Sequence, residues 1–150
     1  MADLGMDADR RTGPSAASSA VDVFGRILLA AIFISSGIGK FLGWPGVVGS
    51  IAGKGLPAPQ LLGALVIAVE LIGSFALITG FGLRWGALAL AGFTLVAGVI
   101  YHNFWAVDAA QYTNQFNHFM KNIAIVGALL IVAARRARSE NEGRLHTSLR

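Results

Sequence analysis

The stretch Leu61–Leu83, LLGALVIAVELIGSFALITGFGL, decides the class of the fold. Its one ionisable side chain is Glu70, and its other residues are apolar, small or hydroxyl-bearing. About 20 such residues wound as an α-helix span the roughly 30 Å hydrocarbon core of a bilayer, whereas apolar runs in the helices of soluble proteins are shorter. This stretch therefore predicts a transmembrane helix.

The composition extends this prediction to the whole chain. Charged residues make up 13% of the 150 residues and hydrophobic residues 55%, whereas soluble domains carry about 25% charged residues. Thirteen of the twenty charges lie in residues 1–22 and 135–150, which leaves seven for the 112 residues between them. Such a chain has too little polar surface to remain soluble, and its length suits one domain. We predict a single integral membrane domain.

Three further segments match the first one in length and character. They cover approximately residues 23–41, 85–105 and 116–137. Each approaches the length that is needed to cross the bilayer, and their glycines suit the close approach of membrane helices. The prediction is an all-α membrane protein, with a four-transmembrane-helix bundle over residues 23–137.

The remaining residues form connections and tails. A tight turn is expected at 79–84, a polar joint at 108–117, and a longer connection at 43–60 that suits a short helix in the membrane interface. Residues 1–22 are expected to be a disordered cytoplasmic tail because they are polar and rich in Ala, Ser and Asp. Residues 138–150 are expected to be a basic cytoplasmic tail.

Basic residues predict the orientation of the spans. With both termini inside, the inner side carries eight arginines, whereas the outer loops carry Lys40 and Lys54, with Lys121 at the edge of the fourth span. Because cytoplasmic loops are enriched in Lys and Arg, this bias predicts an N-in, C-in topology. The expected location is the bacterial inner membrane, which the chain crosses several times.

Several classes of function are disfavoured. The chain has no cysteine, which excludes disulfides, thiol chemistry, Fe–S clusters and thiolate zinc sites, and no metal-binding motif is present. Five of the twelve basic residues follow the last apolar segment. That placement favours the lipid bilayer and its anionic headgroups as the partner, rather than nucleic acid.

Ionisable side chains inside the hydrocarbon point to the candidate site, because each one costs about 2.5–3.5 kcal/mol or more. Glu70 lies nine residues from Leu61, about 14 Å along the helix, and therefore near the bilayer centre. Its helical neighbours Gly63, Gly73 and Ser74 are small, so the carboxylate is expected to point into the bundle. The expected counter-charge is Lys121, about 8 Å into the fourth span.

Other polar residues fall in the same outer half of the bundle. His102, His118 and Lys40 come from the third, fourth and first spans, so all four helices contribute to one polar interior. Asn122 follows Lys121, and Trp105 belongs to an aromatic group at the predicted outer interface. These residues also have purely structural interpretations. Glu70 can belong to a structural ion pair, Lys40 can extend to the membrane interface, and the aromatic residues can anchor the protein there.

Such a set suits proton transfer to a reducible headgroup in the lipid. A quinone that takes two electrons also takes two protons, which a carboxylate or a histidine can supply. A b-type haem held by His102 and His118 is disfavoured, because two histidines alone are a weak signal. We therefore expect a quinone as the cofactor, with Glu70 and His102 handling protons and Lys121 either positioning the headgroup or holding Glu70 ionised.

Most of the sequence also resembles a known protein family. From about residue 26 to residue 132 the chain resembles the DoxX family of small four-helix membrane proteins. The matching pieces are Arg26-Ile27-Leu28-Leu29, Ile32-Phe33-Ile34-Ser35-Ser36-Gly37 with Lys40, Gly55-Leu56-Pro57-Ala58-Pro59, Glu70-Leu71-Ile72-Gly73, Gly80 and Arg84, His102-Asn103-Phe104-Trp105, and Phe119-Met120-Lys121-Asn122.

The resemblance implies a role in membrane redox chemistry. The family is named for a subunit of an archaeal thiosulfate:quinone oxidoreductase, which suggests a membrane subunit working with a redox partner chain, although the thiosulfate substrate does not carry over. The expected catalytic residues are Glu70, His102 and Lys121, and the expected cofactor-binding residues are Lys40, Trp105, His118 and Asn122. The alternative is a non-enzymatic assembly factor, chaperone or lipid-binding protein. Either function is compatible with a homo-oligomer.

Overall fold

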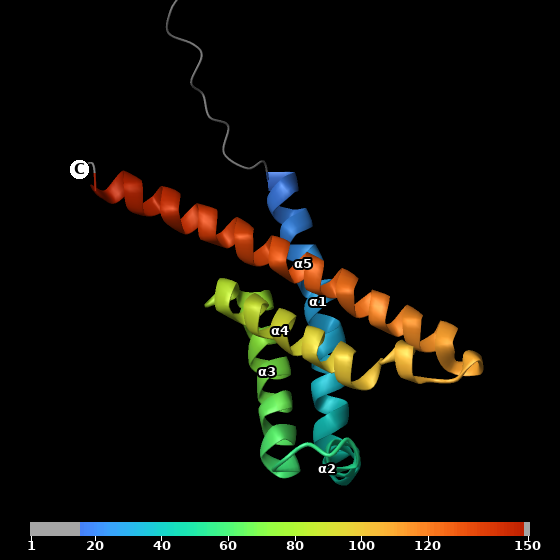
Figure 1. Cartoon of the computed structure of the whole chain (residues 1–150). Helices are drawn as coiled ribbons and strands as arrows, with labels where there is room; N and C mark the ends of the chain where they lie inside the picture. The colour runs from blue at the N-terminus through green and yellow to red at the C-terminus, as the bar shows by residue number, and fades with distance from the viewer. Residues whose placement is uncertain (1–15, 149–150) are drawn as a thin grey trace, which may run out of the picture.

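In the computed structural model, which describes residues 16–148, four long helices make up the protein, as the sequence predicts (Figure 1). Each is long and apolar enough to cross a membrane. The elements in chain order are α1 (Ala16–Leu42), α2 (Trp44–Gly53), α3 (Pro59–Thr79), α4 (Leu83–Tyr101), the short 3₁₀ helix η1 (Phe104–Ala106) and α5 (Ala109–Ser148).

The helices pack in the order α1, α3, α4, α5. Helix α1 lies along α3, and α4 lies along α5, with the second pair inclined to the first (Figure 1). The short helix α2 covers the first turns of α3. The predicted connecting helix within residues 43–60 is confirmed by α2.

Glycines make the turn between α3 and α4 tight. Gly80 ends α3 in the left-handed conformation, with φ of 77°, and its N–H bonds the carbonyl of Ala76. Gly82 precedes α4 with φ of 62°. Because only glycine adopts positive φ without steric cost, these two residues reverse the chain within three positions.

The structure differs from the sequence-based expectations at three boundaries. Most of the joint expected at 108–117 is helical, because Asp108 caps α5: its Oδ1 accepts the N–H of Gln111 at 3.0 Å. Helix α1 begins at Ala16, so residues 16–22 of the expected disordered tail are its first turns. Residues 138–148 of the expected C-terminal tail continue α5, and residues 1–15 of the N-terminal tail lie outside the described part.

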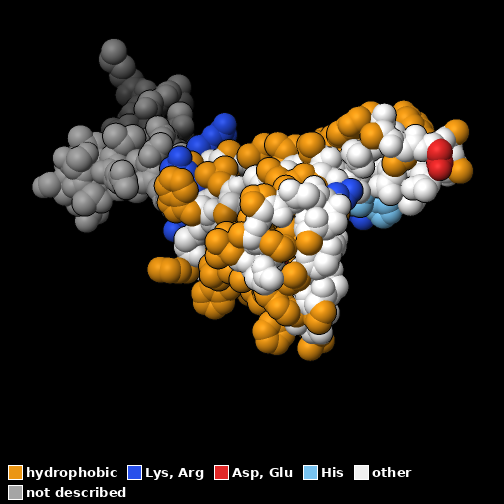
Figure 2. Space-filling view, turned by 60° about the horizontal axis from the view of Figure 1, so that its bottom comes forward, with side chains coloured by type: hydrophobic (Ala, Val, Ile, Leu, Met, Phe, Trp, Pro, Cys, Tyr) orange, Lys and Arg blue, Asp and Glu red, His pale blue; other side chains and the backbone are white. Residues whose placement is uncertain are grey.

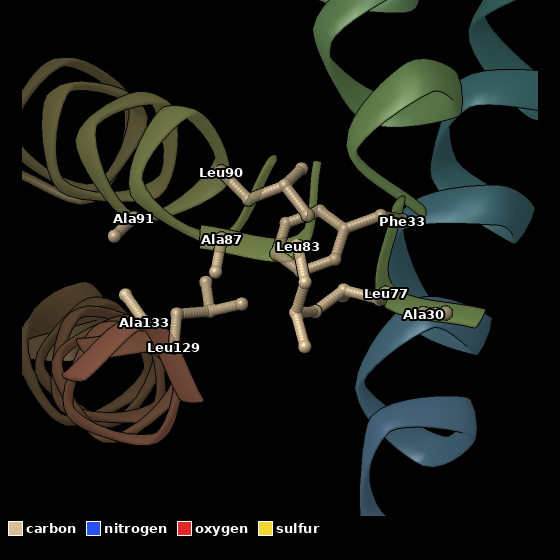
Figure 3. Packing of buried hydrophobic residues seen from close by; sticks show 9 residues of the cluster. All are labelled: Ala30, Phe33, Leu77, Leu83, Ala87, Leu90, Ala91, Leu129 and Ala133. Atoms are coloured by element: carbon tan, nitrogen blue, oxygen red, sulfur yellow. The ribbon is translucent and has the colours of Figure 1, made fainter. Parts of the chain in front are cut away.

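The hydrophobic core lies where all four long helices meet (Figure 3). Leu77, Leu90 and Leu129 are fully buried there, one each from α3, α4 and α5. Many other large apolar side chains face outward, and they cover much of the surface in Figure 2. This distribution is typical of helices that contact lipid.

Close contact between α3 and α4 depends on Gly73. A Cβ atom built there would lie 2.5 Å from Cγ of Leu90. Gly73→Ala is therefore expected to lower the free energy of unfolding by about 1–3 kcal/mol through overpacking. The measurement is equilibrium unfolding in detergent, with Gly92→Ala as the control, because nothing lies within 4 Å of Gly92. Equal stability of the two variants would contradict the close packing.

One end of the bundle, called the arginine end here, brings together the start of α1, the α3–α4 turn and α5. Arg26 donates from Nη1 to the carbonyl of Leu77 at 3.1 Å, and Arg135 lies 3.8 Å from Asp22. Arg84, in the first turn of α4, is at the same end.

The positive charge predicts that the arginine end is cytoplasmic. A reporter fused after Arg150 that functions only in the cytoplasm is expected to be active. Activity of a reporter that needs export, fused at the same point, would reverse the assignment.

Candidate functional site

An ion pair between the buried Glu70 and the half-buried Lys40 joins α3 to α1. Glu70 is 2% exposed, and its Oε1 and Oε2 lie 2.7 and 3.0 Å from Nζ of Lys40. The hydroxyl of Ser36 donates to Oε1 at 2.9 Å, and Lys40 also contacts that hydroxyl. Both carboxylate oxygens are therefore satisfied by charge-assisted hydrogen bonds.

The sequence-based pairing of Glu70 with Lys121 is wrong. Lys121 is exposed on α5, and its Nζ lies 3.2 Å from Nδ1 of His118. The physical reason is the packing of α1 against α3 at Gly37, where a Cβ atom would lie 2.9 Å from Leu71 and 3.4 Å from Cβ of Glu70. That close approach brings Lys40, one turn further along α1, to the carboxylate.

A cavity of about 590 Å³ adjoins the ion pair, and we call it the lysine cavity. Residues of α1, α2, α3 and α4 line it, together with His102 directly after α4. Its polar lining includes Lys40, Tyr101 and His102, whereas Val47, Val66 and Phe93 are among its apolar wall residues. Nζ of Lys40 lies 6.0 Å from the centre of the Phe93 ring, so the ammonium also faces an aromatic surface.

A smaller hollow of about 160 Å³ lies next to the lysine cavity, and Glu70 and Asn122 are among its lining residues. Both spaces are lined by Ser36, Lys40 and Phe93. The carboxylate of Glu70 therefore lies behind Lys40 as seen from the larger cavity.

A second polar group joins α4 to α5 beside the lysine cavity. Nδ1 of His102 lies 3.0 Å from Oε1 of Gln115, and the ring of His102 stacks on that of His118 with centres 5.0 Å apart. The tautomer of His102 decides which of the two groups donates in this contact. With the contact between His118 and Lys121, a polar chain runs from the cavity wall to the exposed face of α5.

The structure separates the predicted site residues into groups. Lys40 and His102 line the lysine cavity, and Glu70 and Asn122 line the smaller hollow. Trp105 lies outside both linings, in edge-to-face contact with Phe104 and Phe119. The residues that sequence analysis missed are Ser36, Phe93, Tyr101 and Gln115.

A sequence signal existed for two of the missed residues. Ser36 lies four residues before Lys40, so the two share a helix face. Tyr101 belongs to the aromatic group at the predicted outer interface, and so dense a group also suits the lining of a pocket. Phe93 lies among similar residues of an apolar segment, and nothing in its spacing distinguishes it.

Comparison with known proteins assigns the family. The DoxX family model matches residues 21–103, which is more than half of the chain. The chain belongs to the DoxX family. Inner membrane protein YphA of Escherichia coli (strain K12) is 32% identical over 108 residues, covering 72% of this chain and 77% of YphA. Inner membrane protein YqjF of the same organism is 37% identical over 108 residues, covering 72% of this chain and 78% of YqjF.

This DoxX protein is an integral inner-membrane protein with four candidate transmembrane helices. The family match includes Lys40, Glu70 and His102, whereas His118 and Lys121 lie beyond it on α5. No solved structure matches the chain.

Proposed function

We propose that the lysine cavity binds the ring of a lipid-soluble quinone, and that this DoxX protein is the quinone-binding membrane subunit of an oxidoreductase. The observation that carries the proposal is that Lys40 and His102 line one cavity between membrane helices while Glu70 lies directly behind Lys40. At about 590 Å³, the volume suits a small-molecule site, and an apolar wall with a few hydrogen-bonding groups is the usual lining.

The chemistry of the lining fits a quinone ring. The ammonium of Lys40 and the imidazole of His102 can donate hydrogen bonds to carbonyl oxygens, while Phe93 and Tyr101 provide aromatic surface. A bound quinone would supply the capacity to accept two electrons and two protons. The electrons would come from a partner subunit, because this chain has no cysteine to ligate an Fe–S cluster.

The protein residues would hold and move protons. Glu70 would hold the ammonium of Lys40 in place through the ion pair, so that Lys40 can donate a hydrogen bond to a quinone carbonyl at the cavity wall. His102 would exchange protons at the cavity wall, whereas His118 and Lys121 would do so at the exposed face of α5, since the contact between the two imidazole rings is stacking and not a hydrogen bond. In this proposal Lys121 does not contact the quinone.

The test measures quinone bound to protein purified with native lipid. Bound quinone is expected in the wild type, and the amount extracted per mole of protein is expected to fall at least tenfold in Lys40→Met/Glu70→Met, since the quinone carbonyl loses its charged hydrogen-bond donor. The double variant removes both charges, so neither is left buried without a partner. Arg84→Met is the control, because Arg84 lies in the first turn of α4 at the arginine end of the bundle and lines neither hollow. Quinone at the wild-type level in the folded double variant would contradict the proposal.

A second candidate function is a non-enzymatic assembly or lipid-binding protein in which the ion pair fixes the helix packing. The observation that favours it is that Lys40 and Ser36 of the same chain satisfy both oxygens of Glu70 without any ligand. The same experiment separates the two functions. Wild-type protein without quinone, together with a loss of stability in Lys40→Met, would support the structural role.

A further inference from the structure

The smaller hollow contains polar groups well inside the candidate spans. Residues of all four long helices line it, and its volume is about 160 Å³. Glu70 and Thr94, on its walls, are 2% and 5% exposed. Asn122, on another wall, lies 13 residues after Ala109, which is about 20 Å along α5. The hollow is therefore a polar space at a depth where hydrocarbon surrounds the bundle.

The packing of α4 against α5 holds the amide of Asn122 at this hollow. The side chain lies over Gly98 of α4, where a Cβ atom would be 3.3 Å from Nδ2 of the amide. Asn122 is half-buried, and its amide makes no hydrogen bond among the described residues. An amide without a hydrogen-bond partner is costly in an apolar environment. Its position therefore favours a ligand that can form hydrogen bonds.

Glu70 and Thr94 add acceptors to the same hollow. A carboxylate has about four acceptor positions, and the three hydrogen bonds from Lys40 and Ser36 leave Glu70 able to accept one more. Oγ1 of Thr94 donates to the carbonyl of Leu90 at 2.7 Å, so its lone pairs stay available. The hollow thus combines amide donors on α5 with acceptors on α3 and α4.

This combination of donors and acceptors favours water over other occupants. A carbonyl group of a quinone or a lipid can only accept, so it would leave the acceptors of Glu70 and Thr94 without a donor. A metal cation would be repelled by the ammonium of Lys40, which lines the same hollow. Water both donates and accepts, and a buried water molecule needs about two to four polar partners. A molecule of liquid water takes about 30 Å³, so the hollow has room for more than one.

We infer that the smaller hollow binds water, and that Asn122 is the residue that holds this water beside Glu70. The water supplies the hydrogen bonds that the amide lacks and hydrates the carboxylate inside the candidate spans. It gives the ion pair a contact with a proton carrier, as polar groups within membrane helices often do. The inference goes beyond the proposed function, because this site needs no quinone.

The test is X-ray radiolytic labelling of the purified full-length chain in lipid nanodiscs. Bound water then forms hydroxyl radicals that oxidise adjacent side chains, and mass spectrometry measures the oxidation. Phe33 is the reporter, because it lines the hollow and is only 5% exposed. Its labelling is expected in the wild type and is expected to fall about fivefold in Asn122→Leu, because the water loses its amide partner. Asn117→Leu is the matched control and is expected to change nothing, since Asn117 is exposed on the same helix and lines neither hollow.

Three outcomes would overturn the inference. Labelling of Phe33 no stronger than that of Leu129, which is fully buried outside the hollow, would show a dry hollow once intrinsic reactivity is corrected. Unchanged labelling in Asn122→Leu would mean that other groups hold the water. Asn122→Ser keeps a donor and an acceptor and is expected to retain most of the labelling, so an equal fall in both variants would mean that only the size of Asn122 matters. Quinone extracted from the same samples tests the proposed function separately.

Discussion

Lys40→Met is expected to lower the free energy of unfolding by about 3–5 kcal/mol, the usual cost of removing one partner from a buried ion pair. Glu70 is 2% exposed, so without Lys40 its carboxylate would retain only the hydroxyl of Ser36. An ionised carboxylate without a counter-charge is costly in a low-dielectric interior. The measurement is equilibrium unfolding of the purified protein in detergent.

Two further variants isolate the cause of that loss. Lys121→Met removes an exposed lysine whose side chain contacts His118, and it is expected to change stability by less than about 1 kcal/mol. Adding Glu70→Met to Lys40→Met is expected to recover most of the lost stability, because paired apolar side chains can replace a buried ion pair. Failure of the second substitution to restore stability would show that the first one acts through lost packing.

Leu90→Ala is expected to cost about 2–5 kcal/mol, the range for emptying a buried leucine site. Leu90 is fully buried, and its side chain fills the space above Gly73 where α3 and α4 meet. The matched control is Leu95→Ala on the same helix, because Leu95 is 44% exposed. Unfolding in detergent compares the two, and a cost at Leu90 no larger than the cost at Leu95 would contradict the packing in Figure 3.

Combining Leu90→Ala with Gly73→Ala should give less destabilisation than the sum of the two single changes. The Cβ atom added at position 73 would point to the side chain removed at position 90. Residues that share one space are not additive in stability. If the two changes in the free energy of unfolding simply add, the side chains at positions 73 and 90 do not share one space.

The helices were predictable because hydropathy reports burial in lipid directly. Glu70 was placed near the centre of its span, and it lies near the middle of α3. Its partner was not predictable from depth alone, since Lys40 and Lys121 both fall in the outer half of the bundle. The spacing of charges along a helix gives height in the membrane, but the order in which helices pack decides which charges meet. Gly37 was the sequence signal for the packing of α1 against α3, because a small residue near Lys40 allows the two helices to approach closely.

The start of α5 could not be predicted from composition. The residues after Asp108 are polar enough to suggest a loop, yet the side chain of Asp108 caps a helix that begins at Ala109. A local hydrogen bond at the helix start therefore outweighed the composition of the turns that follow. The cavity lining at Phe93 and Tyr101 needed the packing of several helices, which one-dimensional periodicity does not supply.

The inclination of α4 and α5 to α1 and α3 has a consequence for how the protein fits its bilayer. The candidate span of α3 has 21 residues and that of α5 has 30, so the two are about 32 and 45 Å long. A hydrocarbon layer of about 30 Å matches α3 standing nearly upright, whereas α5 matches the same layer only when it is tilted. The inclination of α5 to α3 in Figure 1 therefore lets these two helices of unequal length share one membrane thickness.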